Sequence, residues 1–196
     1  MKNIVVIATV LCLSVSTGQA KPQDCEARKK IVSAYSTIKQ LIASSPNDTV
    51  LREQAAKTMR SFVDFNEFAR LSLGKAWKNL DANQRAEYKT EFKALLERTY
   101  LKRFKTNQSF EVIDTQHCRY NKKADRVEIR TTIVCSSVET EVYYRFYGAA
   151  ESWLVYDIVV DDISMMRNYR TSFSRTIREE GFDALLSKLR KSNKDK

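Results

Sequence analysis

Residues 126–147 read RVEIRTTIVCSSVETEVYYRFY, and this stretch decides the fold class. Apolar side chains alternate with charged or polar ones in two runs, 127–135 and 142–146. A period of two is typical of a strand that buries one face, and Ser136-Ser137 between the runs predicts a turn. The stretch therefore predicts an antiparallel hairpin with one apolar face.

Similar runs lie on both sides of this hairpin. The run 110–118 precedes a turn sequence, NKKAD, at 121–125, and the run 154–160 follows a turn at Gly148. Consecutive strands joined by short turns form a meander, so we expect a four-stranded antiparallel sheet. On its inward face we expect Val142, Tyr144, Phe146, Tyr156, Ile158 and Val160.

Apolar residues recur every three or four positions before and after the predicted sheet, which indicates helices. Asp64 precedes Glu67, and Asp81 precedes Gln84, with the spacing of a capping box, and Ser164 can cap a later helix. About six helices covering the apolar face of the sheet predict an α+β fold. The expected helices span residues 24–44, 49–61, 65–73, 82–104, 165–180 and 182–191.

The first twenty residues, MKNIVVIATVLCLSVSTGQA, have the pattern of a secretory signal peptide. Lys2 is followed by an apolar run, 4–15, and Gly18 and Ala20 mark a cleavage site. A membrane anchor is the alternative, but the run is short and no stop-transfer pattern follows. We therefore expect export to the periplasm. The expected organisation is a signal peptide at 1–20 and one domain at 21–196, with helices in 21–107, the sheet in 108–163 and C-terminal helices in 164–191.

The charge balance is strongly basic, with 34 Lys and Arg residues against 24 Asp and Glu residues. A cytosolic protein of this kind would suggest a nucleic-acid partner. An exported protein meets no genome, so we expect anionic membrane surfaces or acidic protein partners and no nucleic acid.

No residue pattern predicts catalysis. His117, the one histidine, lies on a strand at the parity opposite Cys118 and is expected to be exposed. No serine has the neighbours of a catalytic nucleophile, and the His and Cys residues lack metal-ligand spacing. Asp157, Asp161 and Asp162 could bind a hard cation, but solvation at a strand end is favoured. We expect a binding protein with no catalytic residues, no metal and no cofactor.

Three cysteines follow the signal: Cys25, Cys118 and Cys135. In an oxidising compartment, an odd number leaves at least one thiol free or paired between chains. The predicted hairpin puts Cys118 opposite about Val127, and Cys135 then lies roughly 26 Å away. A disulfide needs Cα atoms within about 7 Å, so Cys118–Cys135 pairing is not expected. Whether Cys25 pairs with either stays open.

The stretch FVDFNEFARLSLGKAW, residues 62–77, is crowded with aromatic and aliphatic side chains. Other aromatic residues follow in the expected helices 82–104 and 165–180 and on the inward face of the sheet. Periodicity alone favours a filled core for all of them, and it cannot separate a filled core from a hollow one.

Two long stretches, 62–100 and 153–189, resemble the MlaC (toluene-tolerance auxiliary) family. The matching pieces are DFNEFARLSLG at 64–74, WKNL at 77–80, QR at 84–85, FKALLERTY at 92–100, WLVYDIVV at 153–160, ISMMRNYRTSF at 163–173 and EGFDALL at 180–186. One departure is Asp162-Ile163, where the family usually has Glu-Gly before the serine. The resemblance covers nearly all of the chain after residue 20.

The resemblance implies a periplasmic carrier that moves phospholipid between an outer-membrane lipoprotein complex and an inner-membrane ABC transporter complex, with the acyl tails in an apolar pocket. We expect the carrier to be a monomer. The inward sheet face would supply one wall. The helical wall would be Phe65, Phe68, Leu71, Phe92, Leu95, Leu96, Tyr169 and Phe173. Arg167 and Arg170 are the candidates for contact with the lipid headgroup. The alternatives are a carrier of another lipid such as a hopanoid, a non-lipid adaptor with a filled core, and a small hydrolase or isomerase.

Overall fold

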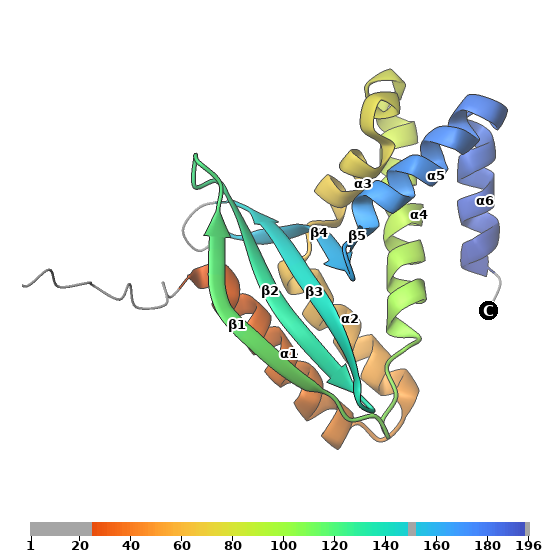
Figure 1. Ribbon diagram of the computed structural model, residues 1–196. Helices are drawn as coiled ribbons and strands as arrows, with labels where there is room; N and C mark the ends of the chain where they lie inside the picture. The colour runs from red at the N-terminus through yellow and green to blue at the C-terminus, as the bar shows by residue number, and fades with distance from the viewer. Residues whose placement is uncertain (1–24, 149–151, 195–196) are drawn as a thin grey trace, which may run out of the picture.

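A computed structural model describes residues 25–148 and 152–194 as an antiparallel sheet with helices packed against it (Figure 1). The predicted signal peptide, 1–20, lies outside the described residues. The elements are α1 (Glu26–Ser44), α2 (Asp48–Phe62), α3 (Phe65–Leu73), the 3-10 helix η1 (Gly74–Asn79), α4 (Ala82–Leu101), β1 (Glu111–Tyr120), β2 (Arg126–Cys135), β3 (Val138–Tyr147), β4 (Leu154–Val160), β5 (Ile163–Ser164), α5 (Met165–Glu180) and α6 (Phe182–Lys194).

The strands follow one another in the order β1-β2-β3-β4-β5, and every neighbouring pair is antiparallel. The α+β class and the meander are therefore confirmed. The predicted count of four strands misses β5, a two-residue strand that turns back along β4. The hairpin of β2 and β3 has the expected register, because inward Ile129 pairs with Tyr144 and Thr131 pairs with Val142.

A β-bulge between β3 and β4 shifts the register by one residue. Arg145 pairs with Asp157, whereas the next residue, Phe146, pairs with Val155, which leaves Tyr156 as the extra residue. An extra residue reverses the facing of the residues beyond it. The prediction that Tyr156 lies on the inward face is therefore wrong.

Tyr156 lies instead on the outer face of the sheet. The guanidinium carbon of Arg126 is 5.1 Å from the centroid of its ring, and the ring of Tyr147 is 6.0 Å away. The alternation of residues along 154–160 does not reveal the bulge. The bulge depends on how β4 pairs with β3 and not on the residues of β4 alone.

Helix caps follow the sequence closely. The Asp81 carboxylate accepts from the backbone N–H of Gln84, and the Gln84 side chain accepts from the N–H of Asp81, which completes the predicted capping box. Asp64 caps α3 through the N–H of Glu67, but its own N–H donates to the carbonyl of Val155 in β4. The capping box predicted at Asp64 is thus only half formed, because the backbone N–H of Asp64 bonds to β4 and not to the Glu67 side chain. This bond joins α3 to the sheet.

The helices form two groups (Figure 1). α1 and α2 lie along one face of the strands β1 to β3, whereas α3, α4, α5 and α6 gather beside β4. Among the described residues, no helix is long and apolar enough to cross a membrane.

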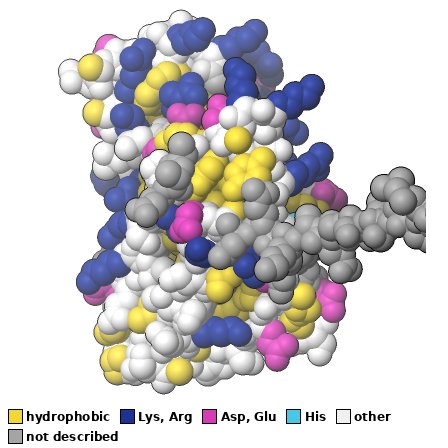
Figure 2. Space-filling model, turned by 90° about the vertical axis from the view of Figure 1, so that its left-hand side faces the viewer, with side chains coloured by type: hydrophobic (Ala, Val, Ile, Leu, Met, Phe, Trp, Pro, Cys, Tyr) yellow, Lys and Arg dark blue, Asp and Glu magenta, His cyan; other side chains and the backbone are white. Residues whose placement is uncertain are grey.

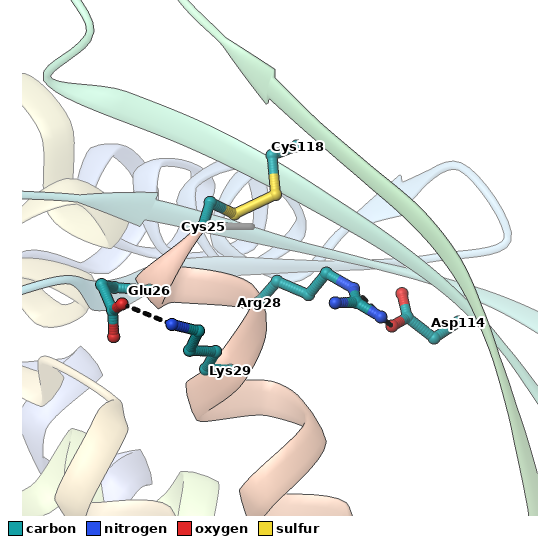
Figure 3. The surroundings of a disulfide bond; sticks show 6 residues. All are labelled: Cys25, Glu26, Arg28, Lys29, Asp114 and Cys118. Carbon is teal, nitrogen blue, oxygen red and sulfur yellow. Dashed lines mark hydrogen bonds and ion pairs between the residues drawn. A yellow bond between two sulfur atoms is a disulfide. The ribbon is translucent and has the colours of Figure 1, made fainter. Parts of the chain in front are cut away.

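A disulfide joins the start of α1 to the sheet. Cys25 is bonded to Cys118 in β1, with their Cα atoms 6.6 Å apart, and nearby Arg28 forms an ion pair with Asp114 at 2.6 Å (Figure 3). Cys135 is a free thiol. The prediction that Cys118 and Cys135 do not pair is therefore confirmed. Cys118 lies opposite Ile129, however, two residues from the predicted Val127.

Candidate functional site

An apolar cavity of about 350 Å³ lies between the inward face of the sheet and the helices α1 and α2. This volume is in the range of pockets that hold small molecules. The end of α4, the segment after it and the start of α5 complete the wall. The wall includes Ile31, Tyr35, Ile38, Ile42, Met59, Phe62, Leu96, Tyr100, Phe104, Phe110, Ile133, Val142, Tyr144, Ile158 and Met165.

Half of the predicted wall residues line this cavity. The residues at the cavity are Phe65, Phe68, Leu96, Val142, Tyr144, Ile158 and Val160. The predicted residues that lie elsewhere are Leu71, Phe92, Leu95, Phe146, Tyr156, Tyr169 and Phe173. The role of the first group in holding a ligand stays a prediction, whereas the second group does not form the wall.

A filled aromatic core explains why several predicted wall residues are elsewhere. The ring of Phe92 in α4 stacks on Tyr88 at 5.6 Å, and it contacts Tyr169 at 5.2 Å and Phe173 at 5.9 Å in α5. The rings interdigitate at the distances of paired aromatic side chains. Phe68 connects the two regions, because it lies 5.7 Å from Phe92 and also lines the cavity.

The helices α1 and α2 supply much of the wall, and no residue of either was assigned to the pocket from sequence. In α1, the lining residues Ile31, Tyr35, Ile38 and Ile42 are spaced four, three and four apart. This stripe is visible in the sequence, since it has the helical period. Nothing in it tells whether the stripe meets a filled core or a cavity.

A polar cluster lies within the apolar wall. The hydroxyl groups of Tyr35 and Tyr144 hydrogen-bond to each other, and Tyr35 is also 3.4 Å from the hydroxyl of Thr131. Burial raises the pKa of Tyr35 and raises that of Tyr144 well above its ordinary value. Both phenols are therefore neutral at physiological pH, and the cavity carries no buried charge from them.

The headgroup candidates Arg167 and Arg170 do not line the cavity. Arg167 is exposed near the start of α5. Arg170 donates its Nε–H to the carbonyl oxygen of Leu71 at 2.7 Å and packs against Gly74, where a Cβ atom would stand 3.3 Å from that nitrogen. Arg170 therefore holds α5 against the end of α3.

The polar residues considered as catalytic or metal-binding candidates are either exposed or bonded to neighbouring side chains. His117 is exposed on β1, as expected. Asp157 is fully buried, where it accepts from the Ser164 hydroxyl at 2.7 Å and from Arg145 at 3.1 Å. Among residues 25–148 and 152–194, no group of three or more His, Cys, Asp or Glu side chains could hold a metal ion. The cavity is thus suited to binding an apolar molecule.

A sheet and helices that surround an apolar cavity define a class of α+β proteins able to hold a hydrophobic ligand. The model of the MlaC protein family matches residues 29–191, and the chain belongs to this family.

One curated protein and one solved structure are similar to this chain. The intermembrane phospholipid transport system binding protein MlaC of Haemophilus influenzae is 23% identical over 171 residues, which are 85% of this chain and 78% of the relative. The solved structure of the phospholipid-binding protein from Ralstonia solanacearum, in complex with a phospholipid, matches with a TM-score of 0.72 at 21% identity. That match covers 86% of this chain and 97% of the Ralstonia chain, and it shows that the fold is shared.

Proposed function

We propose that this chain is a periplasmic phospholipid carrier that holds the acyl tails of its cargo in the cavity. The observation that carries the proposal is the apolar hollow of about 350 Å³ between α1, α2 and the sheet. Family membership supports it, as do the transport role of the Haemophilus relative and the phospholipid bound to the Ralstonia protein.

The physical need for such a carrier is large. Two acyl chains hold roughly thirty CH₂ groups, and at about 0.8 kcal/mol each their transfer into water costs about 24 kcal/mol. An apolar cavity removes most of this barrier. Because tails in a bilayer and tails in the cavity have similar surroundings, the protein can exchange lipid with a partner without hydrolysing a nucleotide itself.

We propose that the chain acts as a monomer between an inner-membrane ABC transporter complex and an outer-membrane lipoprotein complex, and that it is not an enzyme. Lys and Arg side chains are spread over the face of the molecule shown in Figure 2, in keeping with the excess of 34 basic over 24 acidic residues. Such a surface favours contact with anionic membranes or acidic partner surfaces.

The test is to purify the protein from bacterial periplasm without detergent, extract it with organic solvent and identify the extracted molecules by mass spectrometry. Two matched variants accompany the wild type. Ile158→Phe adds bulk inside the cavity, whereas Ile163→Phe adds the same bulk on β5, where Ile163 is 63% exposed.

We expect phospholipid near one molecule per chain in the wild type and in Ile163→Phe, and much less in Ile158→Phe. A hopanoid or another terpenoid in place of phospholipid would keep the cavity as a binding site and change the cargo. A folded wild-type protein without extractable lipid would contradict the proposal.

A further inference from the structure

One charged side chain, Arg103, stands among the residues that line the cavity. It lies just after α4 and is exposed, so it marks the rim rather than the interior. Its guanidinium carbon is 5.9 Å from the ring centroid of Tyr100, which also lines the cavity. In the described part of the chain, Arg103 forms no ion pair with a carboxylate, and the nearby Asp48 pairs with Arg52 and Lys105 instead.

A second cation also contacts a residue of the cavity wall. The ammonium group of Lys39, in α1, is 5.6 Å from the ring centroid of Phe110, another residue of the cavity wall. Phe110 in turn lies 6.1 Å from Tyr35, inside the cavity. Contact between a cation and an aromatic face holds each charged group beside an apolar wall while leaving its hydrogen-bond donors available.

This rim lies at the end of α1 that is not tied to the sheet by a covalent bond. The Cys25–Cys118 disulfide and the Arg28–Asp114 ion pair hold the start of α1 against β1. At the other end, Ile38 packs in a small cluster with Leu101, Phe104 and Phe110 that is separate from the main core. The contacts that hold this end are noncovalent: Arg52 of α2 donates to the carbonyl oxygen of Phe104 at 3.2 Å, and Asp48 accepts from the backbone N–H of Thr106 at 2.9 Å.

We infer that Arg103 and Lys39 form a phosphate site at the rim, where the headgroup of a bound phospholipid stays in water while its tails enter the cavity. The inference rests on the proposed function and names a part of its binding site. A phosphate group cannot follow the tails into an apolar cavity, because burying an unpaired charge is costly. Arg and Lys are the side chains that pair with phosphate, and the Arg guanidinium can do so with two parallel hydrogen bonds.

A groove between α1 and α2 is the competing place for a headgroup. It shares Phe62 with the cavity and carries three lysines. Lys29 binds Glu26 at 2.9 Å, Lys30 donates to a backbone carbonyl at 3.1 Å, and Lys57 lies 3.9 Å from Glu53. These lysines already have partners, which favours the rim at Arg103 and Lys39.

The test compares two fluorescent probes that carry the same labelled acyl chain: a phosphatidylglycerol and a diacylglycerol that lacks the phosphate. Their dissociation constants are measured for wild type, Arg103→Gln, Lys39→Gln and Lys57→Gln. The last variant removes a lysine from the competing groove and serves as the control. All three substituted side chains are exposed, so circular dichroism suffices to check that each variant folds.

We expect Arg103→Gln to weaken phosphatidylglycerol binding about tenfold and Lys39→Gln about threefold, with diacylglycerol binding unchanged. Lys57→Gln should bind both probes like the wild type. Equal binding of phosphatidylglycerol by Arg103→Gln and wild type would overturn the inference, and so would a loss confined to Lys57→Gln. If the wild type binds neither probe, the proposed function fails instead.

Inorganic phosphate separates a lipid headgroup site from a general phosphate site. Titrated against the wild type without lipid, it should not saturate below millimolar concentration, since the tails supply most of the binding free energy. Tight binding of inorganic phosphate that depends on Arg103 would overturn the assignment to a headgroup.

Discussion

The hydroxyl groups of Tyr35, in α1, and Tyr144, in β3, hydrogen-bond to each other across the cavity wall. They connect a helix and a strand that are more than a hundred residues apart in the chain. Because Tyr144 is only 8% exposed, its hydroxyl depends on this partner rather than on water. The pair therefore links the two sides of the cavity by a polar contact inside an otherwise apolar region.

Replacing Tyr144 by Phe removes this hydrogen bond. Tyr35 then keeps only the long contact of 3.4 Å to Thr131, so we expect the free energy of unfolding to fall by about 1 kcal/mol. Urea denaturation at pH 7 measures the change. Tyr143→Phe, on the opposite face, removes a hydroxyl that donates to the partly exposed Glu141 and should cost less. Equal losses in the two variants would contradict the assigned role.

The same pair predicts a dependence of stability on alkaline pH. Burial raises the pKa of Tyr35 and of Tyr144 in the folded state, whereas an unfolded tyrosine titrates near pH 10. The folded protein thus holds these protons more tightly, so the stabilisation is full below about pH 10 and is lost as the pH rises above it.

We expect the double variant Tyr35→Phe, Tyr144→Phe to lose less stability between pH 9 and pH 11 than the wild type does. Some loss should remain, because burial also raises the pKa of Tyr147, to about 12. Urea denaturation at several pH values gives the slope of the free energy of unfolding against pH for the wild type and for the double variant. Identical slopes would show that the pair does not contribute.

The Cys25–Cys118 disulfide closes a loop with a sequence separation of 93 residues. A cross-link of this kind lowers the entropy of the unfolded chain, so replacing both cysteines by Ser should cost about 2–4 kcal/mol. Guanidinium denaturation under oxidising conditions measures the loss. Cys135→Ser removes the free thiol and should leave the unfolding midpoint nearly unchanged. A wild-type midpoint that does not move on addition of a reductant would contradict the expected stabilisation.

Asp157 is a buried carboxylate whose partners lie on three elements. It accepts from the Met166 backbone N–H at 3.0 Å, from the Ser164 hydroxyl and from Arg145. Asp157→Asn removes the charge that pairs with Arg145, and we expect a loss of about 3 kcal/mol in the free energy of unfolding. Asp161→Asn is the control, since Asp161 is exposed at a positive φ that Asn adopts readily. A similar loss in both variants would argue against the buried pair.

Cys135 offers a probe of cavity occupancy, because it is a free thiol that lines the cavity. We expect a thiol reagent such as a maleimide to react several times more slowly with lipid-loaded protein than with delipidated protein. Mass spectrometry of the labelled chain follows the rate, and the Cys135→Ser variant gives the background. A rate independent of lipid would place the tails away from Cys135.

Local features of the sequence predict most of the secondary structure correctly. The alternation in 126–147 identifies β2 and β3, and Asp81 and Ser164 cap helices as their patterns indicate. These signals succeed because strand alternation and helix capping depend on residues a few positions apart. These local signals do not predict the bulge at Tyr156, since the bulge arises from the pairing of β4 with β3.

The candidate site could be predicted only in part for the same reason. Phe65 and Phe173 carry equally strong aromatic signals, yet Phe65 lines the cavity and Phe173 lies in the filled core. The periodicity of a segment predicts which of its side chains are buried. Whether a buried side chain faces a cavity or packs against another side chain depends on residues far away in the chain.

By itself, the sequence determined the class of fold, the order of its main elements and the buried face of most of them, because those depend on backbone geometry and neighbouring residues. Only the tertiary structure decided which apolar faces enclose a cavity, that Cys25 reaches Cys118, and that Arg103 rather than Arg170 stands at the rim. Each of these depends on contacts between residues far apart in the chain, whose distances no local pattern encodes.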